Sequence, residues 1–550
     1  MHMAMNLPPP SRRINLHTNG KCRSLPPVTL AGLVLGILLI AAVPRPLSAA
    51  AKNILHRGTA SELRSLDPQA VIGNTAGALM YELFEGLMTV DQHGNLVPGV
   101  AESFTRSEDG LTYTFKLRKG LLWSDGTPLT AADFVYSWKR ILDPKNALRG
   151  AGTLFPVKNA VAITRGEKNI DTLGIRARDP LTLDVALETR TPYFTDILAG
   201  FPTAPVPRHV VEKHGAQWTM PGNIVSNGAY NLAEWISNTH YRLVRNTKYR
   251  EAALTKIDEV FYYPIADRET AEKRFRAGEL DIVLNTSPNR LEWLRENLPG
   301  ELRITSSLGI RYLVINTSKP PLNDVRVRKA LSIAIDREVI ATRILKDGSD
   351  PTYQLVPPAL PGYGPNPPAF RNQPYSQRVA EAKRLIAAAG FGSSKPLRFS
   401  LHFQNTEEAR RAAVALQAMW RPVGANAELA TTGFQGQVNN LMSGDYNIAW
   451  FTYYVPYSDA TAFLHLLESA NSRNYSRYAN PKFDEMLLES NNIATATERA
   501  AFLRKAEQTA LADFPVIPLF VPARVYLVSK RVQGWEDHLE THPARFLSIR

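Results

Sequence analysis

The stretch DGLTYTFKLRKGLLWSDGTPLTAADFVYSWKR, residues 109–140, reads as two strands followed by a helix. Apolar and polar residues alternate over 111–118, the period-2 pattern of a strand with one buried face. The Ser-Asp-Gly run at 124–126 supplies turn chemistry. Thr130 can then begin a helix, with Asp133 as a carboxylate near its N-terminus. Strand-like and helical stretches alternate in this way along the whole chain, which predicts mixed α/β domains.

The first 49 residues have the pattern of a secretory signal peptide. They hold five basic residues and no acid, an uncharged run at 28–43, and small residues at 47–51. We expect cleavage after Ala49 or Ala50. The apolar run is shorter than the ~20 residues that span a bilayer, and an uncleaved anchor is the alternative. Residues 11–16 resemble a twin-arginine motif only in part, because Asn15 replaces the usual aromatic residue.

The single cysteine, Cys22, lies before the apolar run, so it cannot carry the lipid of a lipoprotein. It leaves with the signal peptide. The mature chain would then contain no disulfide, no thiol nucleophile and no thiolate metal site. An export signal without a lipid anchor predicts a soluble periplasmic protein.

Size and charge narrow the class of protein further. About 500 mature residues exceed one hydrophobic core, so two or three domains are expected. The net charge of +13 is spread along the chain, with no arginine block interleaved with aromatic residues, which argues against a nucleic-acid partner. We find no P-loop, G-x-S-x-G, H-E-x-x-H or Rossmann glycine pattern, so the sequence disfavours an enzyme and predicts no cofactor.

Several local patterns make structural predictions of their own. Residues 76–88 form an amphipathic helical pattern, and Asn227-Gly228 is a strong hairpin-turn signal. Gly278 is expected as the first residue past a helix. Asn323 or Asp324 should cap a helix whose buried side carries apolar residues, namely Val327, Ala330, Leu331, Ala334 and Ile335.

Motifs in a fixed order accompany the stretch at 109–140. They are SLDP at 65–68, LFEGL at 83–87, NGAY at 227–230, GELD at 278–281, and NTSKPPLNDVRVRKALSIAIDR at 316–337. Together they resemble the bacterial extracellular solute-binding proteins of the peptide and nickel family, family 5. The resemblance runs from about Leu55 to the C-terminus. It implies a protein that binds and delivers a solute and catalyses no reaction.

The resemblance also implies an α/β fold, that of a two-lobed periplasmic binding protein of type II in the three-domain peptide-binding branch. The first domain would be discontinuous, taking residues 50–84, 208–307 and 526–550. The second, residues 85–207, would be inserted into it, and the third, residues 308–525, would form the other lobe. Two lobes joined by crossing strands would close over the ligand.

The resemblance further implies where a ligand binds. Peptide binders of this family hold the peptide as an added strand, and two charged anchors lie in one stretch that corresponds to residues 444–459 here. Trp450 stands at the position of the arginine anchor, Thr452-Tyr453 at the G-W pair, and Pro456 at the aspartate anchor. Tyr457 matches the family tyrosine, and Phe434 falls where this branch often carries tryptophan. Both charged anchors are therefore absent.

Several residues are candidates for the ligand site in their place. A strand sends neighbouring residues to opposite faces, so Trp450 and Tyr454 are either core residues or part of a cleft rich in aromatic rings. Asp459 is a candidate replacement for the missing aspartate. The other candidates come from positions that match the family: Ile72, Gly73, Asn74, Arg311 and Tyr312.

The sequence thus predicts a periplasmic solute-binding protein that delivers a peptide or peptide-like ligand to an ABC permease and its ATPase subunits. We expect it to act as a monomer. A non-peptide solute, whether sugar-like, modified or a metal chelate, is the alternative. His538 and His542 would share a face only on a helix, and Pro543 argues against one, so we interpret them as part of an exposed segment.

Overall fold

Three β-sheets organise this protein, for which we describe a computed structural model. The structure describes residues 52–71, 74–284, 286–287, 290–455, 457–537 and 541–550, with Asn74 and Thr75 by their backbone only. The expected signal peptide, Ile72, Gly73 and Pro456 lie outside the described residues. Among the helices of the described residues, none has the length and apolar character needed to cross a bilayer.

The first sheet has seven strands in the order β12-β19-β11-β1-β10-β9-β8. Strand β1 pairs in parallel with both β10 and β11, and the remaining pairs are antiparallel. The strands are β1 (Ile54–Thr59), β8 (Tyr230–Ile236), β9 (His240–Arg245), β10 (Glu259–Pro264), β11 (Ile282–Val283), β12 (Leu302–Ser306) and β19 (Ala523–Val528), and the associated helices are α1 (Asn74–Leu83), α5 (Arg208–His214), α6 (Arg268–Arg276) and α7 (Leu291–Asn297).

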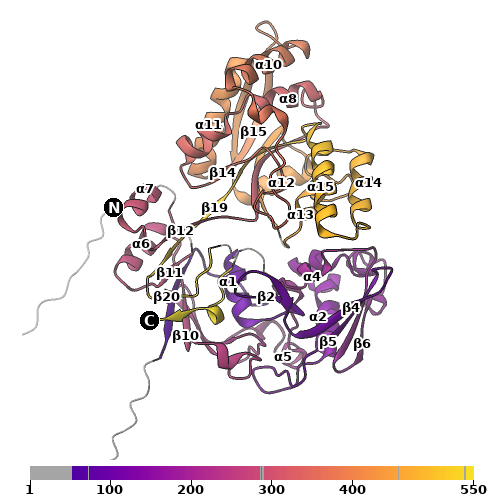
Figure 1. The fold of residues 1–550 in the computed structure, drawn as a ribbon, viewed down its shortest axis with the longest axis vertical. Coiled ribbons are helices and arrows are strands. Elements are labelled where there is room, and N and C mark those ends of the chain that lie inside the picture. The colour runs from indigo at the N-terminus through magenta and orange to yellow at the C-terminus, as the bar shows by residue number, and fades with distance from the viewer. Residues whose placement is uncertain (1–51, 72–73, 285, 288–289, 456, 538–540) are drawn as a thin grey trace, which may run out of the picture. The chain divides into compact units, whose positions relative to one another are not determined.

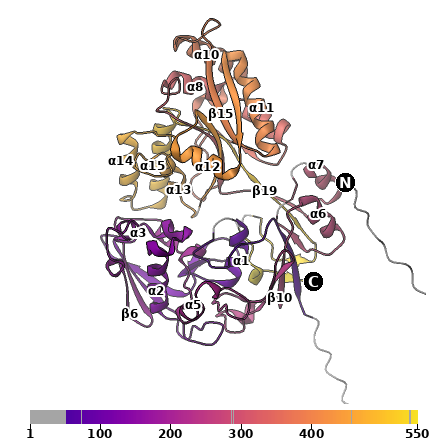
Figure 2. The same ribbon diagram turned by 180° about the vertical axis from the view of Figure 1, so that it is seen from behind.

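The second sheet has four antiparallel strands in the order β4-β5-β7-β6. On β5 the residues Tyr113, Phe115 and Leu117 are buried, as their period-2 pattern predicts. The backbone N–H of Thr130 donates to Asp133 Oδ2 at 2.8 Å, which confirms the expected start of helix α2. Figure 2 shows α2 beside β6. The elements are β4 (Ala101–Arg106), β5 (Thr112–Leu117), β6 (Ile175–Asp179), β7 (Thr182–Ala186), α2 (Ala131–Leu142), α3 (Ala160–Thr164) and α4 (Phe194–Ile197).

The third sheet has six strands in the order β14-β18-β13-β17-β15-β16. Helices α8, α10 and α11 lie around β15 (Figure 1). The strands are β13 (Gly309–Ile315), β14 (Asp350–Pro351), β15 (Leu397–Gln404), β16 (Ala425–Thr432), β17 (Ile448–Tyr454) and β18 (Val516–Val521), and the helices are α8 (Val325–Ile333), α9 (Arg337–Val339), a π-helix (Ile340–Leu345), α10 (Tyr375–Ala388), α11 (Glu407–Trp420), α12 (Phe434–Ser443), α13 (Thr461–Leu464), α14 (Pro481–Ser490) and α15 (Ala496–Leu511). Two short antiparallel pairs of strands complete the described fold: β2 (Met88–Val90) with β3 (Leu96–Pro98), and β20 (Val532–Gln533) with β21 (Ser548–Ile549).

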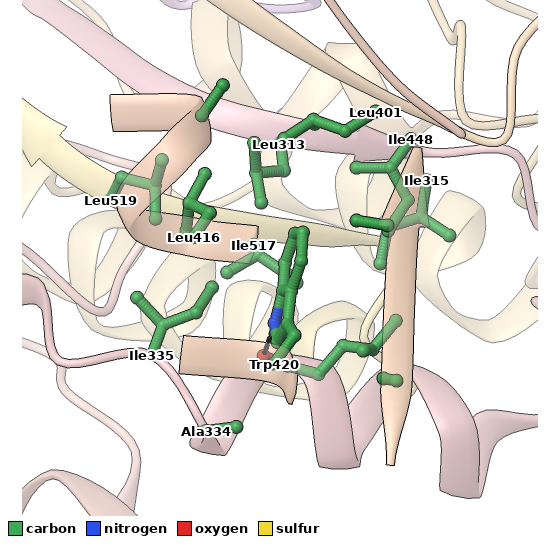
Figure 3. Packing of buried hydrophobic residues seen from close by; sticks show 14 of the residues in the cluster. Leu313, Ile315, Ala334, Ile335, Leu401, Leu416, Trp420, Ile448, Ile517 and Leu519 are labelled. Carbon is green, nitrogen blue, oxygen red and sulfur yellow. Dashed lines mark hydrogen bonds between the residues drawn. The ribbon is translucent and has the colours of Figure 1, made fainter. Parts of the chain in front are cut away.

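Trp420 is a central residue of the core beneath the third sheet. Its ring packs among Leu416, Ile517 and other apolar side chains of the sheet and helices (Figure 3). Its Nε1–H donates to the carbonyl of Leu331 at 2.9 Å, so the polar end of the ring is satisfied inside the core. The predicted buried side is confirmed, because Val327, Ala330 and Leu331 of α8, and Ala334 and Ile335 just after it, are all fully buried.

Two short connections join the third sheet to the first. The chain passes from β12 to β13 through Ser307, and from β18 to β19 through Pro522. Ser307 donates to the carbonyl of Pro522 from both its backbone N–H (3.1 Å) and its hydroxyl (2.7 Å). We call the six-stranded sheet with its helices lobe 2, and the seven- and four-stranded sheets with theirs lobe 1. The boundaries of the three expected domains remain a prediction.

Two local predictions are wrong. The helix expected over 76–88 is α1, which ends at Leu83. Asn227-Gly228 does not form a hairpin turn; it precedes β8 in a loop, where the side chain of Asn227 bonds the backbone N–H and carbonyl of Glu85. A Cβ at Gly228 would lie 2.4 Å from the carbonyl oxygen of Glu82. The Asn-Gly pair therefore allows close contact between two segments and does not reverse the chain.

Candidate functional site

Two adjoining cavities lie between the lobes, with volumes of about 330 and 490 Å³. They share Arg268, Arg311 and Glu408, so we treat them as one site. Lobe 1 contributes residues of β1, α1, α6 and β19 to the wall, and lobe 2 contributes residues of β13, β17 and α11. A size in the range of about 300–1,000 Å³ is typical of small-molecule sites.

The polar centre of the site is a cluster of one guanidinium and two carboxylates. Arg311 Nη1 lies 3.1 Å from Asp347 Oδ2 and also contacts Glu408 Oε1. Strand β13 carries Arg311, Glu408 lies in the first turn of α11, and Asp347 follows the π-helix. The backbone N–H of Ser349 donates to Asp347 Oδ1 at 3.0 Å, which orients that carboxylate.

Burial dominates the electrostatics of Glu408. Desolvation raises the pKa of its carboxyl, and Asp347 adds to this, while Arg311 and Arg268 act in the opposite direction. Like charge from Asp347 and loss of water both disfavour the ionised form. The neutral form of the Glu408 carboxyl is therefore favoured more than that of an exposed glutamate.

Strand β17 divides the aromatic stretch between two faces. Trp450, Thr452 and Tyr454 point to the cavities, and Tyr454 is 41% exposed. Phe451 and Tyr453 face the other way, toward the core under α13–α15. Trp450 has a double role, because it is buried against Phe520 at 5.6 Å between ring centroids and also lines the larger cavity.

Asp459 and Tyr457 lie at a different contact between the lobes. Asp459 binds Arg499 through both carboxylate oxygens, at 2.5 and 3.1 Å, and accepts from the backbone N–H of Thr461. The ring of Tyr457 stacks on Tyr193 of lobe 1, with centroids 4.9 Å apart and planes 5° apart. Neither residue lines the two cavities described above.

The remaining predicted residues are spread over the molecule. Arg311 lines both cavities, whereas its neighbour Tyr312 is fully buried and packs edge-on against Phe451. Phe434 is the first residue of α12 and is 65% exposed. The side chain of Asn74 lies outside the described part of the chain, as do Ile72, Gly73 and Pro456.

The sequence did not predict the two acidic residues of the site, Asp347 and Glu408. Glu408 follows Thr406, the N-cap of α11, and acids are common in a first helical turn, so nothing in the sequence marks it as a cavity residue. Asp347 precedes a glycine in a turn and is equally ordinary in sequence. Arg268 begins α6 and lines both cavities, again without a local signal.

The prediction that the C-terminal histidines lie in an exposed segment is wrong for His542, whose side chain is buried. His538 lies outside the described residues, and His542 Nε2 bonds the carbonyl of Glu536 at 2.9 Å. The imidazole also stacks on Trp535, with centroids 3.5 Å apart. Within the described ranges, no three His, Cys, Asp or Glu side chains are gathered as metal ligands would be.

Comparison with known proteins identifies the family. The sequence profile of the bacterial extracellular solute-binding proteins, family 5 (middle), matches residues 95–475. The chain belongs to this family. It is therefore a solute-binding protein and not an enzyme.

Relatives within family 5 match nearly the whole chain. The chain is 37% identical to the periplasmic oligopeptide-binding protein OppA of Escherichia coli, covering 94% of this chain and 97% of OppA. It is also 37% identical to the probable deoxycholate-binding periplasmic protein YgiS of E. coli, covering 92% and 96%. The solved structure of the E. coli murein tripeptide binding protein MppA has a TM-score of 0.79 at 34% identity, covering 91% of this chain and 99% of MppA. The expected α/β binding-protein fold is confirmed.

Proposed function

We propose that this protein is the substrate-binding component of an ABC importer and that it captures peptides or peptide-like solutes between its lobes. The location of the two cavities at the junction of both lobes carries this proposal. Relatives named as oligopeptide-binding and murein peptide-binding proteins support the peptide class. The protein would deliver its ligand to a membrane permease coupled to ATPase subunits, and it would do so as a monomer.

The ligand contacts follow from the walls of the cavities. Arg311, Trp450, Thr452 and Tyr454 line them and are the predicted residues that we retain as primary contacts. The hydroxyl groups of Thr452 and Tyr454 and the aromatic rings of Trp450 and Tyr454 suit a ligand with both polar and apolar surface. Asp459 and Tyr457 would influence ligand binding only indirectly, through the second contact between the lobes.

Closure of the lobes would couple binding to delivery. Only two connections, at Ser307 and Pro522, join lobe 2 to the seven-stranded sheet, and they are hydrogen-bonded to each other. Such a pair of crossing segments suits a hinge. A ligand that contacts both lobes binds the closed state better and shifts the population toward it.

A non-peptide solute is the second candidate. The chain is as similar to a probable deoxycholate-binding protein as to an oligopeptide-binding protein, at 37% identity each. Apolar groups of Leu284, Val525 and Tyr454 line the smaller cavity and would suit a hydrophobic ring system. Both charged anchors of the family's peptide binders are also replaced, by Trp450 and Pro456.

Native mass spectrometry of the protein purified from the periplasm tests the proposal. A ladder of short peptides released from the protein would support the peptide class, and a single bile-acid-like mass would support the alternative. The same spectrum reports the mass of the mature chain, which should begin at residue 50 or 51. An empty protein that neither a peptide library nor deoxycholate stabilises against heat would contradict the proposal.

A further inference from the structure

We propose that Tyr193 and Tyr457 form a latch, a direct contact between the lobes that raises the population of the closed arrangement before any ligand binds. Tyr193 lines neither cavity, so it would set ligand affinity from outside the site, by positioning the lobes. This inference builds on the lobe closure of the proposed function. It can be tested on the ligand-free protein, so the two can fail separately.

The first argument is that one side chain of lobe 1 reaches three elements of lobe 2. The ring of Tyr193 stacks on Tyr457, which follows β17, with centroids 4.9 Å and planes 5° apart. The Tyr193 hydroxyl lies 3.4 Å from Nε2 of His465, just after α13. The guanidinium of Arg499, on α15, lies 5.6 Å from the centre of the same ring. Aromatic stacking, a polar contact and a cation–π contact therefore meet at one residue.

The second argument is that the core of lobe 1 fixes Tyr193 in place. Tyr193 is the N-cap residue of α4, and its carbonyl accepts from the backbone N–H groups of Asp196 and Ile197, at 3.1 and 3.2 Å. The next residue, Phe194, is fully buried and packs against Tyr113, with centroids 5.2 Å apart. Because its neighbours belong to this core, Tyr193 cannot follow lobe 2 when the lobes separate, and the contact must break.

The third argument is that lobe 2 presents an equally fixed surface. Asp459 binds Arg499 through both carboxylate oxygens and accepts from the backbone N–H of Thr461, which ties the loop after β17 to α15. Nδ1 of His465 bonds Oε2 of Glu468 at 2.9 Å, which orients the imidazole ring. Two ordered surfaces lose little conformational entropy when they meet. The contact therefore favours closure.

The latch lies away from the two connections between the lobes. Helices α4 and α13 stand to one side of β12 and β19, the strands that flank the connections at Ser307 and Pro522 (Figure 1). A rotation at these connections displaces distant points most, so opening would carry Tyr193 away from Tyr457. A contact in this position is sensitive to the arrangement of the lobes.

The expected size of the effect follows from the stacked pair. Such a pair shifts an equilibrium by about two- to tenfold. We expect Tyr193→Ala to lower the ratio of closed to open ligand-free protein by at least about twofold. The apparent ligand affinity falls with the fraction of protein that is competent to bind. It should therefore fall by no more than the same factor, because the walls of the cavities are unchanged.

Distances between spin labels in the ligand-free protein test the latch. The only cysteine, Cys22, precedes the expected cleavage sites, so Lys119→Cys on lobe 1 and Lys482→Cys on lobe 2 would be the only labelled positions. Both lysines are exposed. Pulsed electron paramagnetic resonance gives the populations of short and long distances. We expect the ratio of short to long distances to fall at least about twofold in Tyr193→Ala and in Tyr457→Ala. The double variant should show no further fall, because each single change removes the same stack.

Two control variants separate a latch from a general structural role. Tyr193→Phe keeps the stacked ring and should keep the wild-type distances. Phe155→Ala removes a 42% exposed ring from lobe 1 and should also leave the distances unchanged. Thermal unfolding identifies any variant that does not fold, and Tyr457→Ala carries the test if Tyr193→Ala is such a variant.

Three outcomes would overturn the latch. The first is a ligand-free wild type with only the long distance, and the second is an unchanged distance distribution in both Tyr193→Ala and Tyr457→Ala. The third is a loss of ligand affinity in Tyr193→Ala that exceeds the fall in the ratio of closed to open protein, because Tyr193 would then be a ligand contact.

A separate measurement addresses the proposed function. An equimolar mixture of tri- to pentapeptides of alanine and lysine is added to the labelled wild type. Peptide capture predicts a shift toward the short distance and a higher thermal midpoint. If the mixture changes neither, peptide capture fails, while the latch stands on the ligand-free distances.

Discussion

Asp459 illustrates how a charged residue close to a lost anchor can have a structural role. Its distance from the anchor position is only three residues, which makes it a natural replacement in sequence. In the structure it pairs with Arg499, whose guanidinium also lies 5.6 Å from the ring of Tyr193. Asp459 therefore links α15 to the loop after β17.

Replacing Asp459 by asparagine should cost stability more than affinity. The ion pair with Arg499 is largely buried, so its loss should lower the free energy of unfolding by about 2–4 kcal/mol. Peptide affinity at fixed temperature should change less than about threefold. Thermal unfolding and titration calorimetry measure the two effects. Asp445→Asn, whose side chain is 87% exposed, is the control; a large loss of affinity in Asp459→Asn without loss of stability would make Asp459 a ligand residue.

Arginine roles could be predicted from the sequence only where the partner is local. Arg326 pairs with Asp324 two residues away. Arg328 is buried and donates to the carbonyls of Leu322, Asn323 and Asp513. The carbonyl of Asp513 is 185 residues distant, and no local pattern encodes such a contact.

At the scale of elements, strand β17 separates binding from packing by simple alternation. The sequence predicts that neighbours face opposite sides, but it does not tell which side is the cavity. The pairing of β17 with β13 and the helices on each face decide that question. Helix α8 could be predicted from the sequence alone, because its cap at Asp324 and its buried apolar residues lie in one continuous segment.

Neighbouring tyrosines of β17 should respond to mutation in opposite ways. Tyr454→Ala removes an exposed cavity wall and should reduce ligand affinity by at least about fivefold, while the free energy of unfolding changes by less than about 1 kcal/mol. Tyr453→Ala removes a ring packed against Phe463 and should cost about 2–4 kcal/mol of stability. Calorimetry and denaturant unfolding of both variants check the pair. Equal effects of the two on affinity would contradict the assignment of faces.

Gly228→Ala should disrupt the contact between α1 and the loop before β8. The added Cβ would lie 2.4 Å from Glu82 O and 2.5 Å from the carbonyl carbon of Leu83, which forces backbone movement. We expect a loss of at least about 2 kcal/mol in the free energy of unfolding. Gly392→Ala, where nothing lies within 4 Å, is the matched control. A Gly228→Ala protein as stable as this control would refute the close approach.

At the scale of the whole molecule, the lobes meet in a second place, away from the cavities. Tyr193 of lobe 1 stacks on Tyr457 and contacts His465 Nε2 at 3.4 Å through its hydroxyl. Asp196 lies on the short helix α4, whose N-cap residue is Tyr193, and burial together with the charge of Asp459 raises the pKa of Asp196 to about 6. This contact should therefore respond to pH.

Asp196 should favour the folded protein more at low pH than at neutral pH. Its folded pKa of about 6 exceeds the ordinary value of 3.8, so its contribution is complete below pH 3.8 and is lost as pH rises through 6. Asp196→Asn should therefore stabilise the protein at pH 8 by about 1–2 kcal/mol and have little effect near pH 4. Thermal midpoints across this range measure the difference, with Asp171→Asn as the exposed control. Stabilisation that does not vary with pH would contradict the assignment.

The sequence alone predicts the family, the fold class and the wall of the site that β17 forms. It does not predict that Asp347 and Glu408 meet Arg311 at this site. Strand β17 stands out in the sequence without the family motifs, because four of its seven residues are aromatic. Asp347 and Glu408 are 61 positions apart and meet only because the third sheet brings the π-helix and α11 to Arg311. Such a cluster is a property of the tertiary fold.

A crystal structure of the purified protein with its co-purified ligand would test the central claim most directly. We expect electron density for the ligand between the lobes, within hydrogen-bond distance of Arg311 and in contact with Trp450 or Tyr454. Density for a ligand against Asp459, with Arg499 displaced, would contradict the structural role that we assign to Asp459. Density outside the space between the lobes would contradict the proposed mode of binding altogether.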